Sequence, residues 1–60
     1  MSPKIEKKDK ILDAAEALFA YHGYDGVTMR KIASEAGVDL ALAGYHFGKK
    51  MDVFEAVFQR

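Results

Sequence analysis

The sequence contains no cysteine, no apolar run of membrane-spanning length and no net charge. The missing cysteines exclude a disulfide framework and a thiolate metal site, and they fit a reducing compartment. Without a long apolar run or the apolar core of a signal peptide, neither a membrane span nor a secretory leader is expected, so we expect a cytoplasmic protein. Nine basic residues balance nine acidic ones. Bulk charge therefore does not indicate nucleic acid, and any such role must depend on where the charges lie.

Hydrophobic residues follow helical spacing through most of the chain. Half of the 60 residues are hydrophobic and 30% are charged, a balance typical of one small globular domain. A domain of this size buries only about 60% of its unfolded surface, so we expect marginal stability. The spacing predicts an amphipathic helix over Lys8–His22, and residues 1–7 form either a basic N-terminal arm or a frayed helix start. The apolar stripe of this helix consists of Ile11, Leu12, Ala15, Leu18 and Phe19.

Breaks containing glycine separate this helix from two short ones. Gly23 ends the first helix, and Thr28 is a good N-cap for the second. Gly37 ends the second helix after about two turns, and Asp39 is expected to cap a third helix over roughly residues 40–46. The sequence thus predicts a run of short helices after one long one.

Cations stand where helices normally prefer acids. The second helix begins with Met29, Arg30 and Lys31, and a fourth helix is expected to begin beside Lys49 and Lys50. A helix N-terminus already carries about half a positive charge, so lysine there is locally unfavourable unless an anion arrives from outside. A chain of phosphates would supply that anion. Any one of these cations could be a solvated helix start without a function, but the two doublets favour nucleic-acid binding.

The fourth helix has no C-terminal cap in the sequence. Its helical pattern of hydrophobic residues runs to Arg60 without a glycine or other stop signal. We therefore interpret the chain as the N-terminal part of a larger protein.

The second and third helices have the sequence pattern of a helix-turn-helix. They are short, a turn containing glycine joins them, and an alanine lies four residues before that glycine. Ala33 is small where the third helix must cross close to the second. Gly37 suits a turn that needs the left-handed conformation. Generic helical bundles use such turns too, so this pattern alone leaves both interpretations open.

Two longer strings, ILDAAEALFAYHGYDGVTMRKIASEAGV and YHFGKKMDVFEAVF, resemble the DNA-binding domain of the TetR family of bacterial transcriptional regulators. The resemblance covers about residues 8–58. It implies an all-α fold, a three-helix helix-turn-helix bundle of the homeodomain-like type plus the start of a fourth helix. The DNA-binding domain would occupy residues 8–60 and the helix-turn-helix about 28–47. A C-terminal domain, absent from this chain, would bind a small-molecule inducer and form a homodimer.

The resemblance also implies which residues contact DNA. Two positions at the start of the second helix match backbone contacts, three on the third helix match contacts to base edges or the nearby backbone, and three match phosphate contacts. The backbone-contacting positions of the second helix are Thr28 and Arg30. The positions on the third helix that face base edges or the nearby backbone are Leu40, Ala41 and Gly44, and the phosphate-contacting positions are Tyr45, His46 and Lys50. The chain departs from the family where Ala43 replaces a large aliphatic residue and Gly44 replaces tyrosine. A glycine there weakens the recognition helix by about 1 kcal/mol relative to alanine.

The third helix offers few groups for direct base recognition. Residues 40–44 have no side-chain donor or acceptor, although they can contact thymine methyl groups. We therefore expect specificity from methyl contacts, water bridges and DNA shape, with phosphate contacts setting the register. Leu42 is assigned to the core and Leu40 to the groove.

The sequence supports one leading function and one alternative. The leading function is sequence-specific binding of double-stranded DNA, at a palindromic operator, as the operator-binding domain of a ligand-responsive bacterial regulator that is normally a repressor. No nucleophile–base constellation, cofactor motif or complete metal-ligand set is present, so neither an enzyme nor a cofactor is expected. The alternative is a small helical protein-interaction module that docks a partner through four exposed residues. These residues would be Tyr21, Tyr24, Met51 and Phe58.

Overall fold

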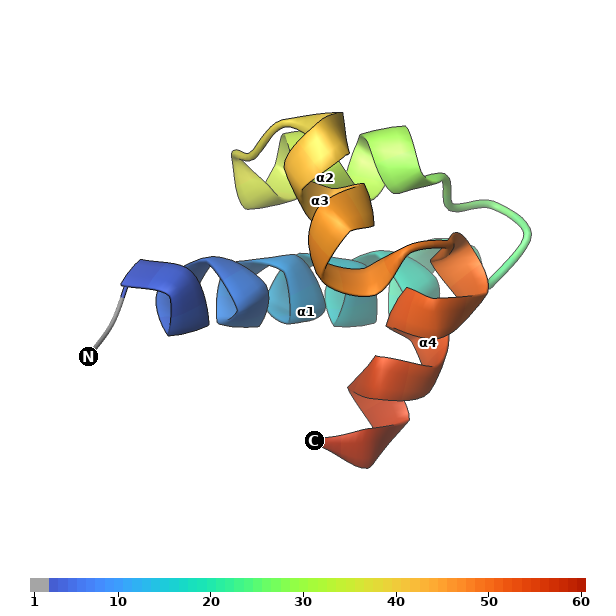
Figure 1. Ribbon diagram of the computed structural model, residues 1–60. Helices are drawn as coiled ribbons and strands as arrows, with labels where there is room; N and C mark the ends of the chain where they lie inside the picture. The colour runs from blue at the N-terminus through green and yellow to red at the C-terminus, as the bar shows by residue number, and fades with distance from the viewer. Residues whose placement is uncertain (1–2) are drawn as a thin grey trace.

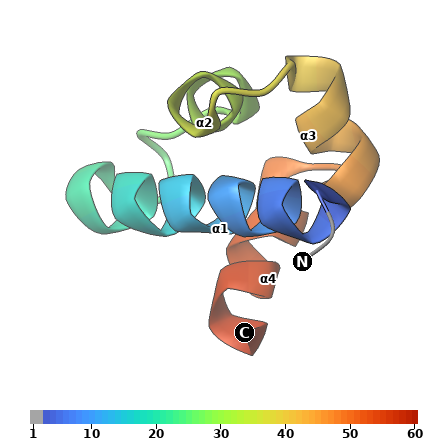
Figure 2. The same ribbon diagram turned by 90° about the vertical axis from the view of Figure 1, so that its left-hand side faces the viewer.

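The computed structural model describes residues 3–60, with side chains from residue 7 onward. This part of the chain forms four helices: α1 (Pro3–His22), α2 (Met29–Ala36), α3 (Leu40–Phe47) and α4 (Lys50–Gln59). Both views show α2 and α3 on one side of the long α1, with most of α4 on the other (Figures 1 and 2). α1 packs mainly against α2 and α4, and α2 packs against α3. The predicted all-α helix-turn-helix fold is confirmed.

One continuous core joins the four helices. Every helix contributes, and so does the loop before α2. The buried residues of this cluster are Ile11, Ala15, Val27, Ile32, Ala33, Ala43 and Val53. The α1 stripe predicted from helical spacing faces this core, with Leu18 and Phe19 half-buried at its edge. Burial of apolar surface against α2 and α4 therefore holds α1 in place.

The ends of α2 follow the predicted local chemistry. The Thr28 side-chain oxygen accepts a hydrogen bond from the Lys31 N–H at 3.1 Å, so it caps the helix. At the other end Gly37 has φ +74°, and its N–H donates to the Ser34 carbonyl. The Val38 N–H donates to the Ala33 carbonyl at 3.0 Å, which completes a Schellman motif. These bonds fix the turn that leads into α3.

Two details of the predicted helices are wrong, at the end of α3 and at its N-cap. α1 begins at Pro3, within the segment for which a helix start was one of the two alternatives. α3 continues to Phe47. Asp39 occupies the N-cap position of α3 with an extended backbone, but its side chain makes no capping hydrogen bond. Only its carbonyl takes part, accepting from the Ala43 N–H at 3.1 Å.

Candidate nucleic-acid interface

α2 and α3 each place an alanine in the common core. Ala33 is 3% exposed and Ala43 is fully buried. Ala43 is thus the core residue of α3. Leu42, which was predicted to lie in the core, is only half-buried and lines a shallow hollow beside Gly37 and Val38. The position of α3 in the core therefore turns the smaller residue inward.

The opposite side of α3 faces solvent. Leu40 is 41% exposed, Ala41 is exposed and Tyr45 is 76% exposed. Gly44 is half-buried, and a Cβ atom built on it would meet nothing within 4 Å. The structure therefore brings these four predicted contact residues to one accessible surface, on which the Tyr45 hydroxyl is the one side-chain hydrogen-bonding group.

His46 lies at the edge of this surface. It is half-buried, and its ring lies 5.5 Å from the Tyr45 ring and 6.4 Å from the Phe47 ring, centroid to centroid. Whether His46 contacts phosphate stays a prediction.

The start of α2 offers one hydroxyl and two cations. Thr28 is exposed, and because its oxygen accepts the capping bond, its O–H can still donate to another group. Arg30 and Lys31 are both exposed. Their charges are therefore available to an anion arriving at the positive end of α2.

The two lysines at the start of α4 differ in exposure and in their contacts. Lys49 is exposed at the N-cap position, and its backbone N–H donates to the Asp52 carboxylate at 2.9 Å. Lys50 is half-buried, and its Nζ donates to the Tyr24 carbonyl at 2.9 Å. The same ammonium lies 4.1 Å from the centre of the Tyr24 ring. Tyr24 was predicted to be an exposed docking residue, and this was wrong because the ring packs among Phe19, Phe54 and Lys50.

Figure 1 shows α2 and α4 beginning on the same side of the molecule, joined through the loop that precedes α2. The Lys50–Tyr24 contact connects this loop to the first turn of α4. Sequence reasoning placed Lys50 at the interface by resemblance but missed Tyr24. No periodic signal links two residues that are separated by a glycine turn and two whole helices.

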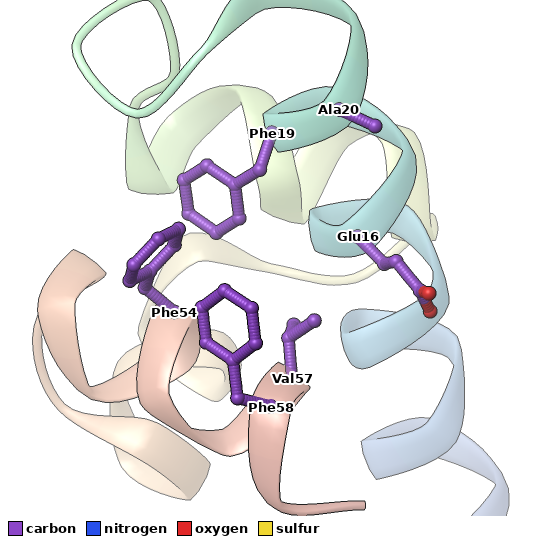
Figure 3. A pocket seen from close by; sticks show the side chains of 6 residues that line it. All are labelled: Glu16, Phe19, Ala20, Phe54, Val57 and Phe58. Carbon is purple, nitrogen blue, oxygen red and sulfur yellow. The ribbon is translucent and has the colours of Figure 1, made fainter.

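A second surface lies between α1 and α4. An apolar hollow of about 400 Å³ opens there, and Figure 3 shows three phenyl rings and Val57 around it. Its lining residues are Glu16, Phe19, Ala20, Phe54, Val57 and Phe58. No lining residue comes from α2 or α3, so this hollow is separate from the surface formed by α3.

An ion-pair cluster ties the end of α4 to α1 beside this hollow. The Arg60 guanidinium lies 2.6 Å from a carboxylate oxygen of Glu16 and 2.6 Å from one of Asp13. Hydrogen bonds to Glu16 and then to Asp13 raise the pKa of Arg60 above its ordinary value. Two acidic groups of α1 are thereby paired at the end of α4 that lies away from Lys50.

Among residues 3–60, none of the helices is long and apolar enough to span a bilayer.

Comparison with known proteins identifies the same segment. Residues 11–57 match the family model described as bacterial regulatory proteins, tetR family. The chain is 44% identical over 48 residues to the biofilm operon icaADBC HTH-type negative transcriptional regulator IcaR of Staphylococcus aureus (strain Newman), covering 80% of this chain and 26% of IcaR. It is 36% identical over 58 residues to the HTH-type transcriptional activator FasR of Mycolicibacterium smegmatis, covering 97% of this chain and 26% of FasR.

A solved structure shares the fold. The crystal structure of HlyIIR, a hemolysin II transcriptional regulator, superposes with a TM-score of 0.90 at 35% identity, covering 95% of this chain and 32% of that one. The chain therefore spans about a quarter to a third of the length of these relatives, and the match falls on all four helices.

Proposed function

The chain belongs to the tetR family of bacterial regulatory proteins and corresponds to its N-terminal DNA-binding domain; from this premise we propose that it binds a palindromic operator as one half of a homodimer and represses transcription in the cytoplasm. The observation that carries the proposal is the exposed face of α3 together with the cations at the starts of α2 and α4, which pack against α3. Such a surface joins a helix that fits the major groove to cations that fit the flanking phosphates.

Side-chain chemistry indicates which residues would contact bases and which would contact phosphates. Leu40 and Ala41 offer apolar contact to thymine methyl groups, and Gly44 permits close approach of the backbone. The DNA backbone would be contacted by residues from three helix regions around this face. These residues are Thr28, Arg30, Tyr45, His46 and Lys50. Specificity would then depend on methyl contacts and DNA shape.

We assign dimerisation and the response to a ligand to a further domain outside these 60 residues. One short recognition helix on a domain of zero net charge provides little affinity by itself. A two-fold dimer would address two half-sites one helical turn, or a multiple of it, apart. A small-molecule inducer bound by the remaining domain would change that spacing. Repression is favoured because IcaR, named as a negative regulator, is 44% identical while the activator FasR is 36% identical.

A fusion experiment tests this function. The 60-residue chain alone should bind duplex DNA at the non-specific level, with Kd of about 10⁻⁴ to 10⁻⁶ M. The chain fused to an unrelated two-fold dimeriser should select a palindrome from random duplexes and bind it with Kd of about 10⁻⁸ M or tighter. Nanomolar binding of a single half-site by the monomeric chain would contradict the proposal.

The apolar hollow between α1 and α4 favours a second candidate, docking of a protein partner. Phe58 is 73% exposed and Met51 is 57% exposed, and Phe58 lines the hollow. Salt separates the two functions: phosphate-driven binding weakens steeply between about 50 and 200 mM salt, whereas apolar docking does not.

A further inference from the structure

The two adjacent lysines at the start of α4 carry the same charge but differ in freedom. Lys49 is exposed, and no side-chain partner is found for it among residues 7–60. The Lys50 ammonium is held at 2.9 Å from the Tyr24 carbonyl oxygen and 4.1 Å from the Tyr24 ring centre. A cation that is already ordered loses less side-chain entropy when it meets an anion than a free one does.

Tyr24 is itself held from two helices. Its ring stacks on Phe19 of α1 at 5.7 Å with an interplanar angle of 16°, and it meets the Phe54 ring of α4 edge-on at 4.9 Å. Its carbonyl oxygen also accepts the Val27 N–H at 3.3 Å within the α1–α2 turn. Both the ring face and the carbonyl that contact Lys50 are therefore fixed by packing and not by the lysine alone.

The ammonium keeps donors for an external anion. It has three N–H bonds, of which one goes to the Tyr24 carbonyl while the aromatic face takes part of the remaining positive charge. Lys50 is only half-buried, so the rest of the group is open to solvent. Asp25 adjoins Tyr24 in the sequence, and Asp52 and Glu55 follow Lys50 within its helix. Asp52 accepts the Lys49 backbone N–H, and none of these three carboxylates forms a hydrogen bond or salt bridge with Lys50.

We propose that Tyr24 is a positioning residue for phosphate binding. It orders the Lys50 ammonium on its ring face and carbonyl, so that Lys50, and not the equally charged Lys49, contributes the phosphate contact at the start of α4. This inference rests on the proposed DNA-binding function. It adds a residue from the α1–α2 loop that does not touch DNA and assigns unequal roles to two neighbouring lysines.

A matched set of variants tests the assignment on the 60-residue chain. Binding to a fluorescent random-sequence duplex is measured by anisotropy from about 0.05 to 0.3 M salt. Lys50→Met and Lys49→Met each remove one charge, so counting charges alone predicts equal effects. We expect K50M to lower the slope of log K against log salt by about one, which is roughly an eightfold loss of affinity at ~0.1 M salt. K49M should change the slope by less than half as much.

Tyr24 variants separate positioning from general damage. Tyr24→Phe keeps the ring and should bind like the unchanged chain. Tyr24→Leu should weaken binding by about two- to eightfold, because the Lys50 side chain would then have to become ordered when DNA binds. In the K50M background, Tyr24→Leu should cause no further loss, whereas a distorted fold would weaken binding in both backgrounds. Thermal unfolding by circular dichroism shows which variants are folded at the assay temperature.

Three outcomes would overturn the inference: equal slopes for K49M and K50M, an undiminished effect of Tyr24→Leu in the K50M background, or Tyr24→Phe binding as poorly as Tyr24→Leu. If Tyr24→Leu does not fold, NMR of the unchanged chain tests the positioning of Lys50 instead. The Lys50 Nζ protons should exchange with solvent more slowly than those of Lys49. Equal exchange rates would refute the positioning. Failure of the proposed function looks different. The unchanged chain would then bind duplex without salt dependence, or not at all, before any variant is compared.

Discussion

A single methyl group added at Gly44 should stabilise this domain. Gly44 lies inside α3, and its backbone is helical. A Cβ atom there would meet nothing within 4 Å, so no steric penalty offsets the gain. Replacing a glycine within a helix by alanine is worth about 0.8 to 1 kcal/mol. For a domain of this size the melting temperature of Gly44→Ala should rise by roughly 4–8 °C per kcal/mol, measured by circular dichroism.

Gly37→Ala is the matched control, because the two sites differ in backbone conformation and not in space. Nothing lies within 4 Å of a Cβ built on Gly37 either, but its φ is +74°. The left-handed conformation costs an alanine about 1–2 kcal/mol, so this variant should melt at a lower temperature. The reasoning is refuted if both variants shift the melting temperature in the same direction.

The same Gly44→Ala variant also probes the interface. If α3 enters the groove with its backbone close to the DNA, the added methyl group should reduce operator affinity of the dimerised chain while stability rises. Higher stability with unchanged operator affinity would show that Gly44 makes no close approach, and its place in the contact surface would have to be abandoned.

Three further variants test the core, the cap and the charges. Ile32→Ala removes a fully buried side chain and should lower the free energy of unfolding, measured by urea titration, by about 2–5 kcal/mol. A loss of that size is enough to unfold most of a marginally stable domain. A loss below about 1 kcal/mol would contradict the assignment of Ile32 to the core. Thr28→Ala removes the bond to the Lys31 N–H and should cost about 1 kcal/mol in the same titration, while Thr28→Ser should be nearly neutral. Arg30→Ala should weaken binding to operator and random duplexes by the same factor and lower the salt slope by about one; a loss confined to the operator would assign Arg30 to base recognition instead.

Much of the fold could be predicted because its signals are local. Gly37 ends α2 through a left-handed backbone, and Thr28 caps it through a bond to a residue three positions away. The α1 stripe repeats at helical spacing and faces the core as predicted. Each of these signals acts within about one helical turn, so the sequence contains it without reference to the rest of the molecule.

Tertiary packing decided what local signals could not. Leu42 was predicted to lie in the core, yet Ala43 is fully buried there and Leu42 is only half-buried. Both residues are apolar neighbours, and hydrophobicity alone does not tell which one a close helix crossing will accept.

The sequence by itself determined the helices, the turns between them and the family. The positions of cations at helix starts were also visible in it. Only the tertiary structure decided how those cations differ, because the Lys50 ammonium meets the Tyr24 carbonyl across 26 positions of sequence. The pairing of Arg60 with Asp13 and Glu16 was equally invisible. Contacts of this kind depend on how α1 and α4 pack together, and that packing is set by the whole core at once and by no single segment of the chain.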